Sequence, residues 1–182
     1  AFIENHDTDR FLGNGKDTLA LKQAYALLLT MNRIPQLYYG TEILMNGTKE
    51  TTDGNVRKDF PGGFVGDKAN KFTREGRTAE ENAMFDWTSR LLHWRQGNEV
   101  IIQGKQTQFI PHNGVYVIAR QYNDKNFMTI LNGRNSANKL EVKRYAEIIG
   151  KQTTARDVTT GKTISLSTDV PLSARQAMVL EF

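Results

Sequence analysis

The longest apolar stretch of the chain predicts a buried helix over residues 18–33. Apolar side chains leave little polar face in the second half of this stretch, and Asp17 or Thr18 can cap its start. A helix that is apolar nearly all round is mostly buried. Pro35 disfavours helical backbone in the residue before it, so we expect the helix to end by about Arg33.

A second helix is predicted from Thr78 to about Gln96, with Gly97 as its stop. Thr78 and Glu81 have the spacing of a capping box, in which each side chain accepts a hydrogen bond from the other's free backbone N–H. Large apolar side chains recur along it at three- and four-residue spacing: Met84, Trp87, Leu91 and Trp94. We expect this face to pack in a core.

From Glu99 onward the apolar period changes to two, which is typical of half-buried strands. Short strands are predicted at residues 115–119, 127–131, 139–142, 163–166 and 177–180. Turn signals such as Asn132-Gly133 separate them. This spacing predicts an antiparallel β-sandwich. We therefore expect two domains, residues 1–98 and residues 99–182.

The N-terminal part predicts a parallel α/β architecture. Residues 2–5 and 34–39 are short apolar segments on either side of the helix of 18–33, and each is followed by polar groups. Adjacent units of a parallel sheet or barrel have this order, and their chemistry lies at the carboxyl ends of the strands. Residues 43–77, rich in Gly, Asn, Asp and Thr, then predict a long loop. Such a loop is expected to wall a substrate cleft, with a floppy insertion as the alternative.

Composition excludes several classes of function. The net charge of +4 is scattered without a long basic run, which argues against nucleic-acid binding. The chain has no cysteine, which excludes disulfides and thiolate chemistry. No apolar stretch reaches the ~18–20 residues of a membrane span. Ala1 precedes an apolar motif without a start Met, so we expect the chain to begin within a longer protein.

Three motifs in this order resemble the α-amylase family, glycoside hydrolase family 13. Phe2-Ile3-Glu4-Asn5-His6-Asp7 is similar to that family's fourth signature region, after the seventh barrel strand. Ile34-Pro35-Gln36-Leu37-Tyr38-Tyr39-Gly40-Thr41-Glu42 is similar to the region at the eighth strand. Residues 53–67 are similar to the neopullulanase/cyclomaltodextrinase subfamily, in particular its Bacteroidetes-type periplasmic members. The resemblance implies an α/β plus all-β fold: the C-terminal part of a (β/α)8 TIM barrel, then an antiparallel β-sandwich.

The resemblance also implies roles for individual side chains. Asp7 matches the third carboxylate of the family, which stabilises the positively charged transition state, so it is the expected catalytic residue. His6 matches the histidine that hydrogen-bonds sugar hydroxyls. Arg10 and Arg57 are candidates for fixing Asp7 or contacting sugar, because the guanidinium fork suits both. Glu42 matches an acidic residue that positions loops.

One alternative role and one cofactor question stay open around these residues. Arg57 has the equal alternative of a loop-stabilising ion pair with Asp53 or Asp59. The resemblance implies no certain cofactor, and calcium is an option in the parent enzyme. Oxygens are offered by Asp53, Asp59, Asp67 and Asn70. Their spacing is not that of an EF-hand, and no metal ligand is assigned.

The family's nucleophile pattern, Gly-x-Arg-x-Asp, and its general acid are both absent from the chain. Retaining hydrolysis needs both groups. The resemblance therefore implies an inactive C-terminal portion of a hydrolase. The parent would cleave α-1,4-glucosidic bonds in maltooligosaccharides, cyclodextrins or pullulan.

The alternatives are a non-catalytic carbohydrate-binding or interaction module, and a transglycosylase or isomerase of the same family. The expected partners are α-glucan oligosaccharides, without nucleic acid or membrane. A homo-oligomer is an option, because residues 1–96 are expected to expose apolar surface. The subfamily implies a periplasmic location, with a cytoplasmic one as the alternative.

Overall fold

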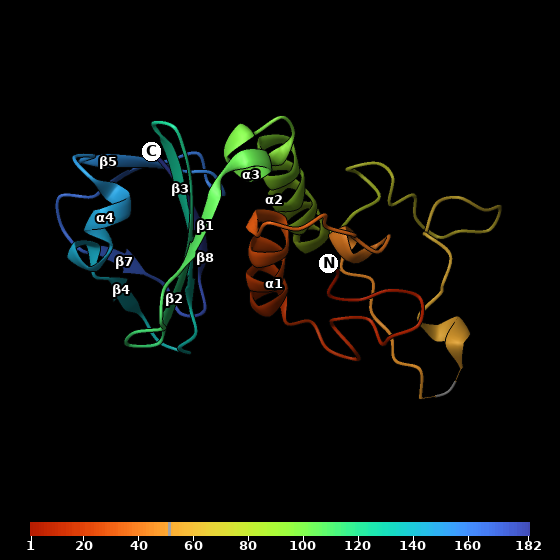
Figure 1. Cartoon of the computed structure of the whole chain (residues 1–182). Helices are drawn as coiled ribbons and strands as arrows, with labels where there is room; N and C mark the ends of the chain where they lie inside the picture. The colour runs from red at the N-terminus through yellow and green to blue at the C-terminus, as the bar shows by residue number, and fades with distance from the viewer. Residues whose placement is uncertain (51) are drawn as a thin grey trace. The chain divides into compact units, whose positions relative to one another are not determined.

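The computed structural model describes residues 1–50 and 52–182 of the chain (Figure 1). The chain forms two compact units. The first holds residues 1–21 and 34–89, and the second holds residues 22–33 and 90–182. Helices α1 (Thr18–Thr30) and α2 (Ala79–Arg95) each contribute residues to both units.

The second unit is built on a six-stranded antiparallel sheet in the order β1-β2-β3-β8-β5-β6. Its strands are β1 (Lys105–Gln108), β2 (Val115–Tyr122), β3 (Lys125–Asn132), β5 (Thr154–Asp157), β6 (Thr163–Ser165) and β8 (Ala177–Glu181). A separate antiparallel pair joins β4 (Asn138–Leu140) to β7 (Val170–Leu172). The short helices are α3 (Glu99–Gln103) and α4 (Ala146–Ile149), the latter after a 3-10 turn at Val142–Tyr145.

The main apolar core lies between the sheet and a second layer made of α4 and the β4–β7 pair, which Figure 1 shows on one side of the sheet. Alternate residues of the sheet point into it: Val117, Ala119, Met128, Ile130, Met178 and Leu180. The facing layer supplies Leu140, Tyr145, Ile148, Ile149, Val170 and Leu172. This period of two is the pattern that the sequence shows after residue 99.

The opposite face of the same sheet carries buried polar side chains. Arg120 on β2 is fully buried, and its guanidinium donates to the carbonyl of Ile101 at 2.8 Å and twice to that of Gly104, at 3.1 and 2.7 Å. Thr129 on β3 donates to the hydroxyl of Thr30 at 2.7 Å. A buried cation is tolerated when its donors are satisfied in this way.

Replacing Arg120 with methionine is expected to destabilise the chain by at least about 2 kcal/mol, because two buried carbonyl groups lose their donors. Lys139→Ala is the matched control. The Lys139–Asp169 ion pair is 2.7 Å long and its lysine side chain is 61% exposed, so its loss is expected to cost much less than the loss of Arg120. Urea unfolding followed by far-UV circular dichroism measures both. Equal costs for the two variants would contradict the role of Arg120.

The predicted helices are present with small changes at their ends. Asp17 caps α1 by accepting from the backbone N–H of Ala20 at 3.0 Å, and the helix ends at Thr30 instead of Arg33. Both bonds of the capping box are formed, with Thr78 N donating to Glu81 Oε2 at 2.7 Å and Glu81 N donating to Thr78 Oγ1 at 3.2 Å. The stop at Gly97 is also present, with a left-handed φ of 70°.

The predicted strands at residues 2–5 and 34–39 are wrong, and no part of a TIM barrel is present among the described residues. The two segments touch through two backbone bonds, from Ala1 N to the Ile34 carbonyl at 2.7 Å and from Gln36 N to the Ala1 carbonyl at 2.8 Å. These bonds alternate as in a parallel ladder. Two segments without further neighbours cannot extend such a ladder or bury both faces, and Ile34 is 88% exposed.

In the β unit the predicted strands are present, although the one predicted at 139–142 ends at Leu140 and gives way to the turn at Val142–Tyr145. Three further strands were not predicted: β1, β5 and β7. The strand β1 is Lys-Gln-Thr-Gln, an exposed edge strand with no apolar face to mark it. In β7 a proline stands at the centre, which the single pairing with β4 accommodates.

The described part of residues 43–77 begins at the end of one 3-10 turn, Thr41–Ile43, holds a second at Asp53–Asn55, and is otherwise irregular backbone. Close backbone approaches nevertheless define its path. A Cβ on Gly62 would lie 2.6 Å from the Cα of Asn70, and one on Gly76 would lie 1.8 Å from the Asn70 carbonyl oxygen. The loop is therefore packed against itself around Asn70, which argues against a floppy insertion.

Exposed large apolar side chains are concentrated before residue 96, as expected. They include Phe2, Phe11, Leu19, Ile34, Phe64, Val65 and Phe72. Across residues 1–50 and 52–182, no helix combines the length and hydropathy that crossing a membrane requires.

Candidate functional site

Asp7 stands on a turn that its neighbours hold in shape. The side-chain oxygen of Asn5 accepts from the backbone N–H of Asp7 at 2.8 Å, and the hydroxyl of Thr8 accepts from that of Asn5 at 3.1 Å. These local bonds form the kind of turn that Asn and Thr favour. The carboxylate of Asp7 also lies 3.2 Å from Nε2 of His6. His6 and Asp7 therefore present their side-chain polar groups together on this turn.

Arg57 brings the long loop to this turn. Its Nη2 lies 3.2 Å from Oδ1 of Asp7 and 3.0 Å from Oδ2 of Asp53, and its Nε donates to the carbonyl of His6 at 3.0 Å. Both interpretations of Arg57 are therefore realised together: it contacts Asp7 and it pairs with a loop aspartate. Asp59 takes no part in these contacts.

Lys49 is a residue that the sequence analysis did not single out. Its ammonium group lies 3.2 Å from Oδ1 of Asp53 and donates to the carbonyl of Asp7 at 3.2 Å. Its backbone N–H donates to Oδ1 of Asp9 at 2.7 Å. A lysine in a polar loop carries no distinguishing pattern, so only the fold reveals that it joins the turn.

The cluster is open to water. The side chains of His6 and Asp7 are 60% and 63% exposed, and that of Arg57 is 41% exposed. Ion pairs at this exposure contribute between about 0 and 1 kcal/mol to stability. A carboxylate stabilises a developing cation strongly only where water is excluded. In this chain the Asp7 carboxylate is held by its contacts with His6 and Arg57, but the described residues do not shield it from water.

Arg10 is buried, which the sequence analysis did not predict. Its side chain is 2% exposed, and it donates to the carbonyls of Val56 at 3.0 Å and Tyr39 at 2.5 Å. The guanidinium carbon also lies 4.0 Å from the ring centroid of Tyr38. These contacts are with backbone and aromatic rings, not with Asp7. Arg10 therefore holds together the segments that carry the site.

Glu4 is a second buried charged residue, and its burial could not be predicted from the motif. It is 1% exposed, and its carboxylate accepts from the backbone N–H of Phe11 and from the hydroxyl of Thr41. One end of this link is in the motif of Asp7 and the other is in the motif of Glu42. Glu4 reads as an ordinary strand residue in the sequence, because the partners that bury it are distant along the chain.

Glu42 lines a cavity of about 400 Å³ in the first unit, together with an aromatic group made of Tyr39, Phe60, Phe72 and Phe85. Burial raises the pKa of the Glu42 carboxyl, against the opposing effects of its own backbone N–H and that of Gly40. The rings of Phe60 and Phe72 lie 4.4 Å apart. The Glu42 carboxyl is therefore partly shielded from water at the wall of this cavity.

Glu42→Gln is expected to raise the stability of the chain at pH 7. The folded chain holds the Glu42 proton more tightly than the unfolded chain, so stability falls as pH rises from about 4.3 through the raised folded pKa. The amide keeps the shape of the carboxyl without this cost. Thermal midpoints at pH 4 and pH 7 measure the effect, and the gain should appear at pH 7 and shrink at pH 4. A loss of stability at pH 7 would contradict it.

The carboxylate of Asp67 binds backbone groups of its own loop. Oδ2 of Asp67 accepts from the backbone N–H groups of Gly62 at 2.6 Å and Phe64 at 3.0 Å, which lowers the pKa of that carboxyl. The side-chain oxygen of Asn70 accepts from Phe72 N at 3.0 Å. Among the described residues, no group of three or more His, Cys, Asp or Glu side chains is placed to hold a metal ion. Calcium therefore gains no support from a ligand set.

Comparison with known protein families matches residues 106–181 to the Cyclo-malto-dextrinase C-terminal domain. The cyclomaltodextrin glucanotransferase of Geobacillus stearothermophilus is 30% identical over 137 residues, which are 75% of this chain and 17% of that enzyme. The alpha-amylase of Niallia circulans is 26% identical over 177 residues, which are 92% of this chain and 30% of that enzyme. The chain thus spans less than a third of the length of these relatives.

Solved structures give the same result for the fold. The alpha-amylase of Geobacillus thermoleovorans, complexed with acarbose, matches 99% of this chain and 38% of its own with a TM-score of 0.72 and 24% identity. AmyP in complex with maltose matches 99% of this chain and 40% of its own, with a TM-score of 0.74 and 19% identity. At these identities the likeness concerns the fold.

The fold and the relatives define the class: a segment related to cyclomaltodextrin glucanotransferases and alpha-amylases, carrying an antiparallel β unit. The resemblance to the α-amylase family is confirmed, and residues 106–181 correspond to the Cyclo-malto-dextrinase C-terminal domain.

Proposed function

We propose that the chain is the C-terminal portion of a retaining α-glucan hydrolase of the neopullulanase/cyclomaltodextrinase type. The observation that carries the proposal is the contact of Asp7 with both His6 and Arg57, formed by motifs that are far apart in the sequence. Residues 1–98 would belong to the catalytic domain of the longer enzyme, and residues 99–182 would form its β domain. The side chain of Asn98 supports this boundary, because it caps α3 at the start of the β domain.

In the longer enzyme, Asp7 stabilises the oxocarbenium-like transition state and His6 hydrogen-bonds sugar hydroxyls. Arg57 holds the carboxylate of Asp7 in one orientation, since it also binds the His6 carbonyl and Asp53. Enclosure by the rest of the barrel supplies the exclusion of water that makes this charge effective. Buried Glu4 and Arg10 position the turn without touching sugar.

The isolated chain is expected not to hydrolyse starch, pullulan or cyclodextrin. A double displacement requires a nucleophile and a general acid, and one stabilising carboxylate cannot replace them. Reducing-sugar release by the purified chain, compared with a heat-treated sample, is the measurement. Release that rises in proportion to the amount of purified chain would overturn this part of the proposal.

In the longer enzyme, Asp7→Asn is expected to lower kcat at least about 10³-fold, the range for losing a main electrostatic stabiliser. Asp59→Asn is the matched control, because Asp59 is an aspartate of the 43–77 loop that takes no part in the contacts of Asp7. Steady-state kinetics on a cyclodextrin, with circular dichroism to establish folding, compares the two. Near-normal turnover of the Asp7 variant would remove Asp7 from the catalytic set.

Transglycosylation is the second candidate reaction, and it is favoured by the relatives named cyclomaltodextrin glucanotransferases. Product chromatography after incubation of the longer enzyme with maltotriose distinguishes the two. Glucose and maltose alone indicate hydrolysis, whereas longer oligosaccharides or cyclodextrins indicate transfer.

We also propose a periplasmic location and self-association of the longer protein. The first rests on the subfamily resemblance, and cell fractionation tests it. The second rests on the exposed apolar side chains before residue 96, such as Phe64 and Phe72. Light scattering after size-exclusion chromatography tests it, and a monomer across the micromolar range would contradict it.

A further inference from the structure

The connection between β1 and β2 ends in a tight hairpin turn that presents an asparagine-glycine pair at the surface. His112 and Val115 exchange two backbone bonds, with Val115 N donating at 2.8 Å and His112 N donating at 3.0 Å. Asn113 and Gly114, the two residues between them, are exposed and have left-handed φ angles of 49° and 75°. Asn-Gly favours two-residue turns of this kind, because both positions need positive φ.

We propose that Asn113 is a site of self-catalysed deamidation, in which the backbone nitrogen of Gly114 displaces the side-chain amide as ammonia. The nitrogen attacks Cγ of Asn113 and loses its proton to solvent, and the bond between Cγ and Nδ2 breaks. Water then opens the resulting succinimide to aspartate or isoaspartate. One water molecule is consumed and one ammonia molecule is released.

The attacking nitrogen is available at this turn and engaged at the other Asn-Gly pairs of the sequence. In those pairs the glycine N–H donates to a backbone carbonyl, at 2.7 Å in Asn14-Gly15 and at 2.8 Å in Asn46-Gly47 and Asn132-Gly133. Within residues 1–50 and 52–182, the N–H of Gly114 meets no acceptor. Attack in the other three pairs must first break a backbone hydrogen bond, which costs free energy.

Two polar side chains contact the amide nitrogen that leaves. Nδ2 of Asn113 donates to Oε1 of Glu141 at 2.7 Å and lies 3.1 Å from Nε2 of His112. The same Nε2 lies 3.5 Å from the other oxygen of Glu141. An amide nitrogen departs as ammonia only when it gains a proton, and histidine is the side chain that most often transfers protons in this way. His112 is therefore placed to accelerate the step.

Arg134 packs against the backbone of Gly114. A Cβ on Gly114 would stand 2.8 Å from both Cγ and Nε of the Arg134 side chain. A cation this close favours the negatively charged form of a neighbouring group, in this case the deprotonated Gly114 nitrogen. The turn thus combines a free nucleophile, a nearby positive charge and a proton donor.

The product would change how the turn is held. Aspartate at this position places a second carboxylate beside Glu141, where the structure has an amide donor. Isoaspartate adds one atom to the main chain inside the small ring that the His112–Val115 bonds close. The Asn113 carbonyl also accepts from Nδ2 of Asn138 at 2.9 Å, on the strand β4. Modification is therefore expected to loosen the contact between this turn and β4.

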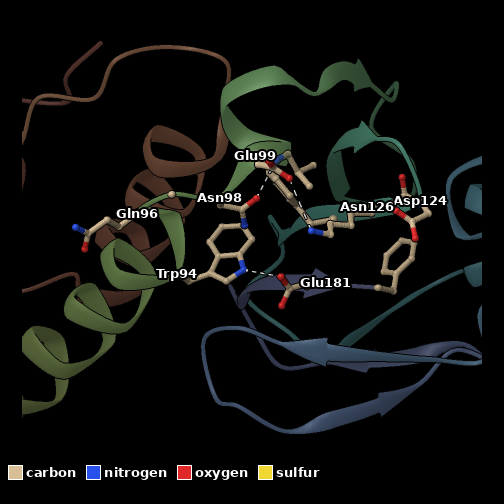
Figure 2. Close-up of a pocket in the computed structure, with 12 residues that line it drawn as sticks. Trp94, Gln96, Asn98, Glu99, Asp124, Asn126 and Glu181 are labelled. Atoms are coloured by element: carbon tan, nitrogen blue, oxygen red, sulfur yellow. Dashed lines mark hydrogen bonds and ion pairs between the residues drawn. The ribbon is translucent and has the colours of Figure 1, made fainter.

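Asparagines without a following glycine serve as a second set of controls. Figure 2 shows two of them, Asn98 and Asn126, beside a cavity of about 650 Å³ in the β unit. They are followed by Glu99 and Phe127, and a Cβ hinders the approach of the next backbone nitrogen to the amide. Both are expected to stay unmodified.

Peptide mass spectrometry of the 182-residue chain, sampled during incubation at neutral pH, tests the proposal. Asn113 is expected to deamidate about tenfold faster than Asn14, Asn46 or Asn132, the factor that one backbone hydrogen bond supplies. In urea the four pairs lose their folded contacts and are expected to react at similar rates. A folded chain in which Asn113 reacts no faster than the other three would overturn the proposal.

The products identify the nucleophile. Attack by Gly114 passes through a succinimide and gives isoaspartate together with aspartate, whereas direct attack by water on the amide gives aspartate alone. Fragment ions that separate the two isomers are expected to show both at Asn113. Aspartate without isoaspartate would remove Gly114 from the reaction.

His112→Gln tests the role of the imidazole. The amide keeps a polar side chain at this exposed turn but cannot transfer a proton as histidine does, so deamidation of Asn113 is expected to slow at least about tenfold. Asn14 in the same sample is the control and should keep its rate, and circular dichroism establishes that the variant is folded. An unchanged rate at Asn113 in the folded variant would contradict the role of His112.

Discussion

Two buried charged side chains of opposite sign organise the part of the chain that carries the candidate site. Glu4 accepts from the backbone of Phe11 and from the hydroxyl of Thr41, and Arg10 donates to the carbonyls of Val56 and Tyr39. These segments have no strand ladder between them, so backbone groups are satisfied by side chains instead. The turn of Asp7 lies between Glu4 and Arg10 in the sequence, and its position follows from where these two residues are fixed.

The residues that hold the candidate site in place are different from the residues that are expected to contact the substrate. The groups that hold the site, Glu4 and Arg10, are buried, where a hydrogen bond to an ion is strongest. The groups expected to act, Asp7 and His6, are more than half exposed. Exposure leaves a carboxylate accessible to a ligand, but the surrounding water weakens its electric field. The role proposed for Asp7 therefore requires that its carboxylate be enclosed, which the described residues alone do not provide.

The sequence predicts those features that depend on local patterns. The capping box at Thr78 and the period of two after residue 99 are marked by residue types at fixed spacing, and both are present. The contact of Arg57 with Asp7 was one of two predicted options, and the motifs alone could not show the geometry of that contact. Burial of Glu4 and Arg10 could not be predicted, because their partners are distant backbone groups. The strands at 2–5 and 34–39 were predicted from apolar runs, and such runs become strands only beside further strands.

Amide hydrogen exchange at Phe11 tests most directly whether buried Glu4 holds the Asp7 turn. In the wild-type chain the Phe11 amide is expected to be protected, since it donates to the Glu4 carboxylate. In Glu4→Ala this protection should be lost, while the amide of Val179 in the centre of the β-sheet stays protected. An unprotected Phe11 amide in the wild type, or equal protection in both chains, would contradict the account.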